Sequence, residues 1–326
     1  MTTTSQRATV HAARPTSWRT LWRAAGWAVA VSAVGYCVVQ AVHAGTRGAV
    51  RPVHPWAVAA SVALLTAVLA WGVLVWRGVL ALLTPTGEPP PSFGALLRVW
   101  APSSVARYVP GGVWQFIAAG ALAPTAGRGR LVGGLAVHTA FSLLAAAVVA
   151  AALAPHGADA WWLARLVAAV SATAALVHPT VLGWLLRTAR RIPGAGALAW
   201  RGRWRDGLRL VGLQVLGWLA YGAAFWLLVH GMADAPTALV GRLTGIAVLA
   251  FLAGYAAVLA PAGLGARELA LTVLLAPAIG PAAPAVALLG RAWSVAADVA
   301  LVAVAAATLQ RTRQRTHQRT HQRERT

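Results

Sequence analysis

The sequence holds few of the residues that disulfide, thiol or nucleic-acid chemistry requires. Cys37 is the only cysteine in 326 residues, and it lies inside an apolar run. A disulfide within the chain and a cysteine-rich metal site are therefore excluded. All 28 basic residues are arginine and only 7 residues are acidic, which gives a net charge of +21. No DNA-reading motif accompanies the arginines, so we expect no nucleic-acid partner.

Acidic residues are scarce and scattered. They are Glu88, Asp159, Asp206, Asp234, Glu268, Asp298 and Glu324. The chain has no Asp-x-Asp pair, no Gly-x-Ser-x-Gly elbow and no P-loop. Because group transfer on a lipid carrier usually needs a carboxylate base or metal-binding acids, we expect no catalytic residues, no metal site and no cofactor. If the protein is an enzyme, Glu268 is the one candidate base.

What the sequence has in abundance is apolar surface. Apolar residues make up 59% of the chain and the mean hydropathy is +0.65, whereas soluble domains are usually about 45–50% apolar. With so few charged residues to cover a water-facing surface, lipid is the expected solvent. The fold class predicted is an all-α polytopic membrane bundle.

Seven apolar runs are long enough to cross a bilayer, which takes about 20 residues. They cover 24–44, 57–82, 131–154, 161–186, 208–231, 237–260 and 284–308. The first run follows basic residues and has a second interpretation as a cleaved signal peptide, although it is longer than a typical h-region. We expect it to remain as an anchor.

Two further apolar stretches are broken by proline and glycine, at 93–123 and 261–280. Arginine-rich segments precede the first run, separate the second from the third and the fourth from the fifth, and follow the last, so both termini are predicted on the cytoplasmic side of the cell membrane. That orientation requires an even number of crossings. We therefore expect 266–280 to cross, giving about eight transmembrane helices, and 93–123 to be re-entrant.

The chain is accordingly divided into three parts. Residues 1–20 form a cytoplasmic N-terminal segment, 21–309 the transmembrane domain, and 310–326 a basic cytoplasmic tail. The tail lacks apolar residues and repeats Arg, Thr, His and Gln, which predicts disorder. His317 and His321 are four residues apart but have no third ligand nearby in sequence, so they are not assigned to a metal.

The two broken stretches are the candidate lipid-binding site. Paired proline- and glycine-broken segments in the two halves of a transporter commonly mark a substrate site near the middle of the membrane. A second interpretation is that these residues only kink tightly packed helices. The first group of candidate residues is Arg107, Tyr108, Pro110, Gly111, Gly112, Trp114 and Gln115, and the second is Pro261, Gly263, Gly265, Arg267 and Glu268.

A helix beginning near Ala266 would present free backbone amides that favour an anion such as a lipid phosphate, and Arg267 would add a full positive charge. The alternative is that Arg267 and Glu268 only cap this helix. Arg291 and Asp298 complete the candidate set. They are seven residues apart and so share one face of the last span. Since each is costly in lipid, we expect Arg291 or Asp298 to pair with Glu268 or Arg267, as a structural ion pair or as part of a polar path.

Two of these stretches carry a resemblance to a known family. The segments RYVPGGVWQ over 107–115 and APAGLGARE over 260–268, followed by Arg291 in the last span, resemble the transmembrane region of lysylphosphatidylglycerol synthases, a flippase-like domain. The likeness covers about 24–308. It implies eight spans with re-entrant elements and movement of an aminoacylated or otherwise modified lipid between leaflets. His138 and Thr139 stand where many relatives have a Glu-Arg pair, which puts the substrate in question.

Three functions follow as alternatives. The first is a flippase-like protein that binds or translocates an anionic, aminoacylated or polyprenyl phospholipid. The second is a membrane-embedded glycosyl or acyl transferase, and the third is a non-catalytic partner of a separate synthase or glycosyltransferase. About 18 polar residues follow the last span, so we do not expect this chain to be a complete aminoacyl-lipid synthase.

Overall fold

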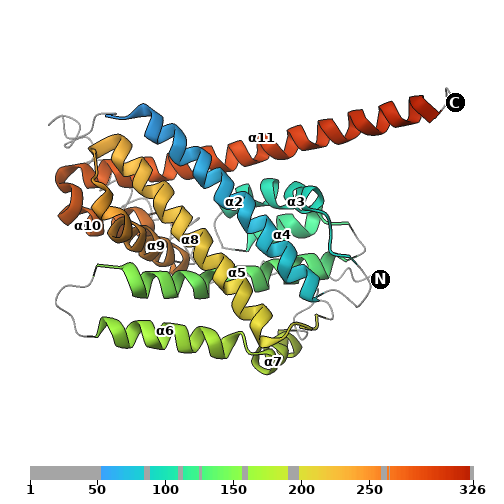
Figure 1. The fold of residues 1–326 in the computed structure, drawn as a ribbon, viewed down its shortest axis with the longest axis horizontal. Helices are drawn as coiled ribbons and strands as arrows, with labels where there is room; N and C mark the ends of the chain where they lie inside the picture. The colour runs from blue at the N-terminus through green and yellow to red at the C-terminus, as the bar shows by residue number, and fades with distance from the viewer. Residues whose placement is uncertain are drawn as a thin grey trace, which may run out of the picture.

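The computed structural model describes residues 53–83, 89–108, 113–124, 127–155, 161–189, 198–257, 263 and 265–323. Every regular element within these ranges is a helix (Figure 1). The predicted all-α bundle is confirmed for this part of the chain.

Five helices are long: α2 (Pro55–Leu83), α5 (Arg128–Leu153), α8 (Trp204–Ala233), α9 (Val240–Ala256) and α11 (Ala283–Arg323). Five are shorter: α3 (Phe93–Val105), α4 (Trp114–Leu122), α6 (Trp162–Leu176), α7 (Pro179–Ala189) and α10 (Ala266–Ile279). Single 3-10 turns lie at η1 (Ala106–Tyr108), η2 (Thr237–Leu239) and η4 (Gly280–Ala282).

Local sequence signals account for several helix ends. Pro55 occupies the first position of α2, where its missing N–H costs nothing. The Ser92 hydroxyl accepts a hydrogen bond from the Ala95 amide and caps α3. At α8 the Asp206 carboxylate accepts from the Arg203 amide at 2.7 Å, and the helix ends where Asp234 adopts a left-handed conformation with φ of 48°.

Among the described residues, five segments are long and apolar enough to cross a membrane, or six if the bent pair α6 and α7 forms one span. The predicted spans at 57–82, 131–154, 208–231 and 237–260 correspond to α2, α5, α8 and η2 with α9. The predicted span at 24–44 lies outside the described residues. The count of about eight spans, and the side on which each terminus lies, stay predictions.

The span predicted over 161–186 is not one straight helix. The structure divides it into α6 and α7, which meet at an angle of 66°. The break falls immediately before Pro179, whose ring disfavours a helical conformation at His178 and removes a backbone donor. Apolar length did not reveal this bend, and the crossing of the membrane by α6 and α7 as one broken span stays a prediction.

The broken stretch at 93–123 forms two short helices, α3 and α4, that pack against each other. Their 13 and 9 residues give lengths of about 20 Å and 14 Å, less than the roughly 30 Å of a hydrocarbon core. Neither helix is long enough to cross alone, as expected for a re-entrant hairpin. The depth of this hairpin in a membrane stays a prediction.

The C-terminal part of the bundle is a helical hairpin of α10 and α11. The chain reverses at Gly280, which has φ of 57°, so that Arg267 and Glu268 of α10 lie beside Ser294 and Arg291 of α11. The two helices are therefore antiparallel, as the sequence predicted for 266–280 and 284–308.

Helix α11 continues beyond the bundle to Arg323, where the sequence predicted disorder from Gln310 (Figure 1). The polar composition of this tail explains why it has no core to join, but it does not prevent helix formation. Arginine and glutamine are good helix formers, and extending an existing helix avoids the cost of a new nucleus.

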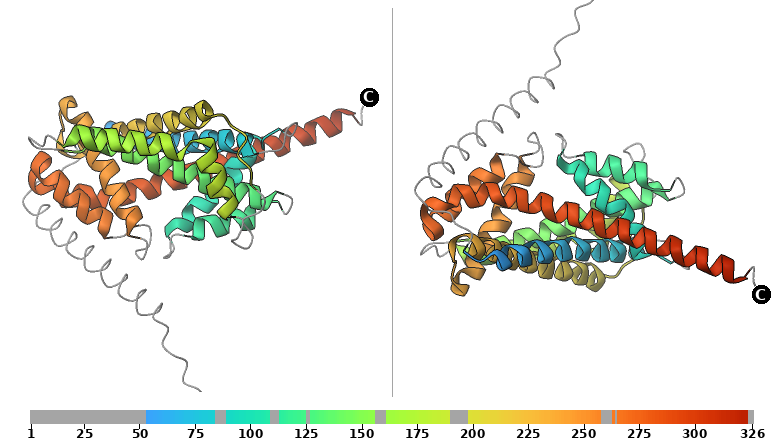
Figure 2. Two further views of the ribbon diagram at one scale, coloured as in Figure 1. Left: turned by 90° about the horizontal axis from the view of Figure 1, so that it is seen from below. Right: turned by 90° about the horizontal axis from the view of Figure 1, so that it is seen from above.

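The centre of the bundle is the antiparallel pair α2 and α8. Its ends are joined by backbone hydrogen bonds, from the Val53 amide to Gly231 O at 2.9 Å and from the Arg201 amide to Leu82 O at 3.0 Å. Helices α5 and α9 pack against α8, while α11 packs against α2 and α3. In both views of Figure 2 the α3–α4 hairpin and the α9–α10 pair lie toward opposite ends of the molecule, on the same side of the α2–α8 pair.

Close helix packing makes one glycine a test of this arrangement. A Cβ atom on Gly245 of α9 would lie 2.1 Å from the backbone oxygen of Leu153, at the end of α5. Backbone cannot move aside cheaply, so Gly245→Ala should destabilise the fold by about 1–3 kcal/mol. Thermal melting of the detergent-purified protein would measure the change.

Gly212 of α8 is the matched control, since its added Cβ meets nothing within 4 Å. Gly212→Ala should leave the melting temperature unchanged or raise it, because alanine is the better helix former. Equal melting temperatures for the Gly245→Ala and Gly212→Ala proteins would contradict this packing of α5 and α9.

Candidate functional site

A cavity of about 510 Å³ lies inside the bundle. Its walls come from α2, α3, η1, α4, α5, α8, α9, α10 and α11, so every long helix contributes. Val113 and Tyr255 line the cavity and are 54% and 46% exposed, which shows that it opens to the surface beside α4 and the end of α9. Its size falls within the range of small-molecule pockets.

The first broken stretch supplies a cation and a phenol to this cavity. Arg107 and Tyr108 lie in η1 and both donate hydrogen bonds to Asp298 of α11, the phenol at 2.7 Å. Ser104 donates to the same carboxylate at 3.3 Å. Asp298 is only 2% exposed, so three donors compensate for the loss of water around its charge.

The second broken stretch brings α10 to the cavity through a tight turn. Gly263 and Gly265 have φ of 66° and 87°, which favours glycine at both positions. A Cβ on Gly263 would also lie 2.4 Å from the Gly254 oxygen of α9. The turn therefore packs directly on α9, and α10 begins one residue after Gly265.

Glu268 is held at both carboxylate oxygens. Oε2 accepts the Gly265 amide at 2.7 Å, and Oε1 pairs with Arg291 Nε at 3.1 Å. The predicted pairing of Arg291 with Glu268 is thus confirmed. The capping interpretation is correct for Glu268, which takes a backbone donor that the sequence analysis had assigned to an anion.

Arg267 has a different environment. Its guanidinium lines the cavity and donates to the Tyr221 hydroxyl at 2.9 Å and to Ser294 Oγ at 3.4 Å. Both partners are neutral. Within the described part of the chain Arg267 forms no ion pair, and the hydrogen-bond partners of its guanidinium there are hydroxyl groups.

The charges around the cavity do not cancel. Arg107 and Arg291 each face one carboxylate, those of Asp298 and Glu268. Among the described residues of this cluster, three arginines less two carboxylates leave one positive charge in excess, on Arg267. The centre of the Tyr108 ring lies 6.0 Å from the guanidinium carbon of Arg107 and 5.9 Å from that of Arg291. The ring face adds a weak attraction for both cations.

A second polar group, Gln214 with His138, lines the cavity about two turns along α8 from Tyr221. Gln214 is seven residues, or about 10 Å, from Tyr221 on this helix, and its amide Nε2 is 3.1 Å from His138 Nδ1 of α5. Both line the cavity and are 5% exposed. The ring centroids of His138 and Trp100 are 5.0 Å apart in an edge-on arrangement, so His138 also connects α5 to α3.

The structure brings most of the predicted site residues together. The described ones that line the cavity are Arg107, Tyr108, Gln115, Gly263, Arg267, Arg291 and Asp298. Glu268 and Gly265 lie behind this lining, and Trp114 is 40% exposed outside it. Pro110, Gly111, Gly112 and Pro261 lie outside the described residues.

Sequence reasoning missed Tyr221, Gln214 and Ser294 as cavity residues. Each is a polar residue flanked by mostly apolar neighbours in a long helix, and this was the available signal. Which of them share a cavity depends on how the helices pack, and no spacing within one helix reveals it.

Comparison with protein-family models, with curated proteins and with solved structures gave no match. The resemblance of the two motifs to the lysylphosphatidylglycerol synthase region accordingly stays a prediction, and the chemistry of the site follows from its own residues.

Removal of the Asp298 carboxylate tests the charge network. Asp298→Ala would leave the Arg107 charge without its carboxylate, and breaking such a pair in a buried site costs about 3–5 kcal/mol. We expect a large fall in melting temperature in detergent. The double variant Arg107→Met, Asp298→Leu should recover much of the loss, because it removes both charges.

The network would be contradicted if the double variant lost as much stability as the two single variants together. It would also be contradicted if Asp298→Ala alone were as stable as the wild-type protein.

Proposed function

We propose that this protein binds the anionic headgroup of a lipid in the central cavity and carries it between membrane leaflets. The observation that carries the proposal is the position of Arg267. It is a cation in a cavity surrounded by apolar helices, with neutral hydroxyl partners and no ion pair within the described residues.

A phosphate fits this chemistry because arginine binds it with two parallel charge-assisted hydrogen bonds. The excess charge of the cluster would be neutralised by one phosphodiester. Tyr221 and Ser294 already hold the guanidinium in the cavity, so little side-chain freedom would be lost on binding.

The rest of the cavity suits a lipid as opposed to a free ion. Apolar side chains from α2 and aromatic rings from α4, α8 and α9 surround the charged cluster, including Leu65, Leu69, Phe116, Trp218 and Phe251. The polar pair His138 and Gln214 offers donors and acceptors to a headgroup beyond the phosphate. The exposed residues Val113 and Tyr255 mark the opening through which acyl chains would remain in the bilayer.

Movement between leaflets would use the broken segments. Arg107 and Tyr108 attach η1 to α11, and Glu268 with Arg291 attaches the start of α10 to the same helix. Short helices joined by turns can shift as units around a fixed site, which is how many transporters alternate access. The resemblance of these same segments to a flippase-like domain supports this part of the proposal.

The geometry favours transport over catalysis at Glu268. Both of its oxygens are engaged and its side chain is 3% exposed, so it is poorly placed to take a proton from a substrate in the cavity.

Neutralising Arg267 is the direct test. The Arg267→Gln protein, in nanodiscs of neutral lipid, should bind a fluorescent anionic phospholipid about 10- to 100-fold more weakly than wild type, the loss expected for one charge-assisted interaction. Arg267→Lys should retain part of the affinity. In reconstituted vesicles, the rate of lipid flipping should be highest for the wild-type protein, lower for Arg267→Lys and lowest for Arg267→Gln.

Arg209→Gln is the matched control, since Arg209 is an exposed arginine of α8 that does not line the cavity. It should bind like wild type. Equal loss in both variants would point to general surface charge, and undiminished binding by Arg267→Gln would overturn the proposal.

A further inference from the structure

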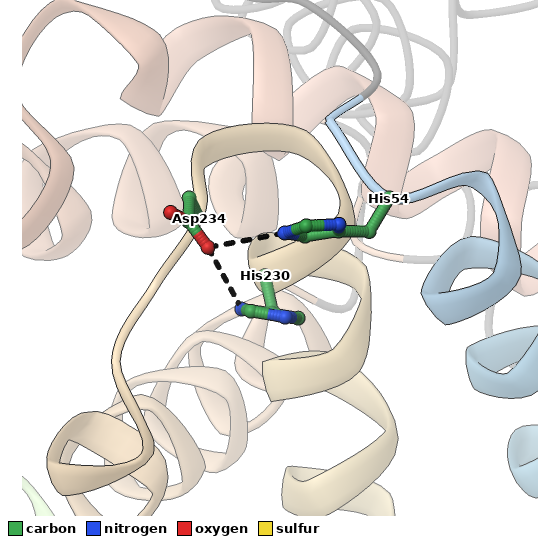
Figure 3. Close-up of side chains that lie close together, drawn as sticks. All are labelled: His54, His230 and Asp234. Carbon is green, nitrogen blue, oxygen red and sulfur yellow. Dashed lines mark hydrogen bonds and ion pairs between the residues drawn. The ribbon is translucent and has the colours of Figure 1, made fainter.

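A second cluster of polar side chains lies at the end of the bundle formed by the start of α2 and the end of α8. It consists of His54, His230 and Asp234 (Figure 3). One nitrogen of each imidazole and one carboxylate oxygen lie within 4.8 Å of one another. The central cavity does not include any of the three residues.

We propose that this cluster binds a divalent transition-metal ion of the zinc type. Two imidazoles and a carboxylate are a common zinc ligand set, and they leave a fourth position for water or another ligand. The ligand atoms would be His54 Nε2, His230 Nδ1 and Asp234 Oδ1.

The distances suit that ion. Bonds of about 2.0–2.1 Å in a tetrahedron place neighbouring ligand atoms about 3.3 Å apart. Asp234 Oδ1 is 3.2 Å from His54 Nε2 and 3.5 Å from His230 Nδ1. Two of the three edges are therefore close to the required length, and the third needs only a side-chain adjustment.

The cluster is held in place by its surroundings. The Val53 and His54 amides both donate to Gly231 O, at 2.9 Å and 3.2 Å, and so attach the start of α2 to the last turn of α8. The His230 ring stacks on His54 with centroids 4.7 Å apart and on Trp226 at 5.2 Å. Asp234 sits at φ of 48°, an unusual conformation for a non-glycine residue, and its carboxylate lies beside the two stacked rings, near one nitrogen of each (Figure 3).

Metal binding would replace existing hydrogen bonds. Without metal, His230 Nδ1 is 3.0 Å from Ala235 O, and His54 Nε2 is 3.2 Å from the Asp234 carboxylate. Coordination needs both nitrogens unprotonated, so a proton leaves any ligand nitrogen that carries one as the metal–nitrogen bond forms. The side chains of His54 and Asp234 are 34% and 66% exposed, which gives an ion in solution access to the site.

The expected role is a brace between α2 and α8. These helices supply Leu65, Gly72, Gln214 and Tyr221 to the cavity, so a metal at their joined ends would stiffen two of its walls. This role is independent of what the cavity binds.

The test uses the tag-free full chain in detergent, with zinc chloride as the probe and magnesium chloride as the comparison. Zinc at micromolar concentration should raise the melting temperature by several degrees, and magnesium should not, because it prefers oxygen ligands. Cobalt(II) should give the visible absorption of a tetrahedral site, at one ion per chain.

Two variants localise the effect. His54→Gln removes one ligand, while Asp234→Asn removes the carboxylate charge but keeps a residue that tolerates the left-handed conformation. Both should lose the zinc shift and the cobalt spectrum. His178→Gln is the matched control, since His178 bonds to Thr180 away from the cluster, and it should respond like wild type.

The proposal would be overturned if zinc did not raise the melting temperature of the wild-type protein. The three residues would then act only through their hydrogen bonds, and His54→Gln would lower the melting temperature in the absence of metal. A zinc shift that persists in His54→Gln and Asp234→Asn, but disappears in His317→Gln, His321→Gln, would overturn it as well by placing the metal on the tail.

Discussion

The buried Asp298 carboxylate is the group on which the rest of the site depends. A charge that is 2% exposed inside an apolar bundle is stable only with donors around it. Arg107, Tyr108 and Ser104 provide these donors, and all three belong to the first broken stretch or the helix leading into it. The need to solvate one carboxylate thus fixes η1 against α11 and places a phenol and a guanidinium at the cavity wall.

A second ion pair, between Arg291 and Glu268, fixes the start of α10 against the same helix. Arg291 is drawn to Glu268, which in turn holds the Gly265 amide and so defines where α10 begins. With two arginines and two acids committed to each other, Arg267 is the cation that can respond to a ligand. The capping interpretation is confirmed for Glu268, whereas anion binding at the neighbouring Arg267 stays a proposal.

Sequence alone predicted those parts of the molecule that depend on local rules. Apolar length predicted α2, α5, α8 and α9. The cost of charges in lipid predicted that Arg291 or Asp298 would pair with Glu268 or Arg267, and the Arg291–Glu268 pair confirms this. The bend before Pro179 had a local signal that apolar length outweighed. By contrast, Asp298 and Arg107 are 191 residues apart, and His54 and Asp234 are 180 residues apart. Contacts of this kind depend on helix packing, and no sequence motif indicated that His54 and His230 would lie together. The sequence analysis considered metal-ligand pairs only where they were close in sequence, so it did not consider His54, His230 and Asp234 together.

The central claim is that an anionic lipid headgroup occupies the cavity beside Arg267. Cryo-electron microscopy of the protein in nanodiscs made from an anionic phospholipid tests this most directly. The account predicts phosphate density within hydrogen-bonding distance, about 3 Å, of the Arg267 guanidinium, with acyl-chain density leaving past Val113 and Tyr255. Lipid density confined to the outer surface of the bundle, with only water or side chains around Arg267, would contradict it.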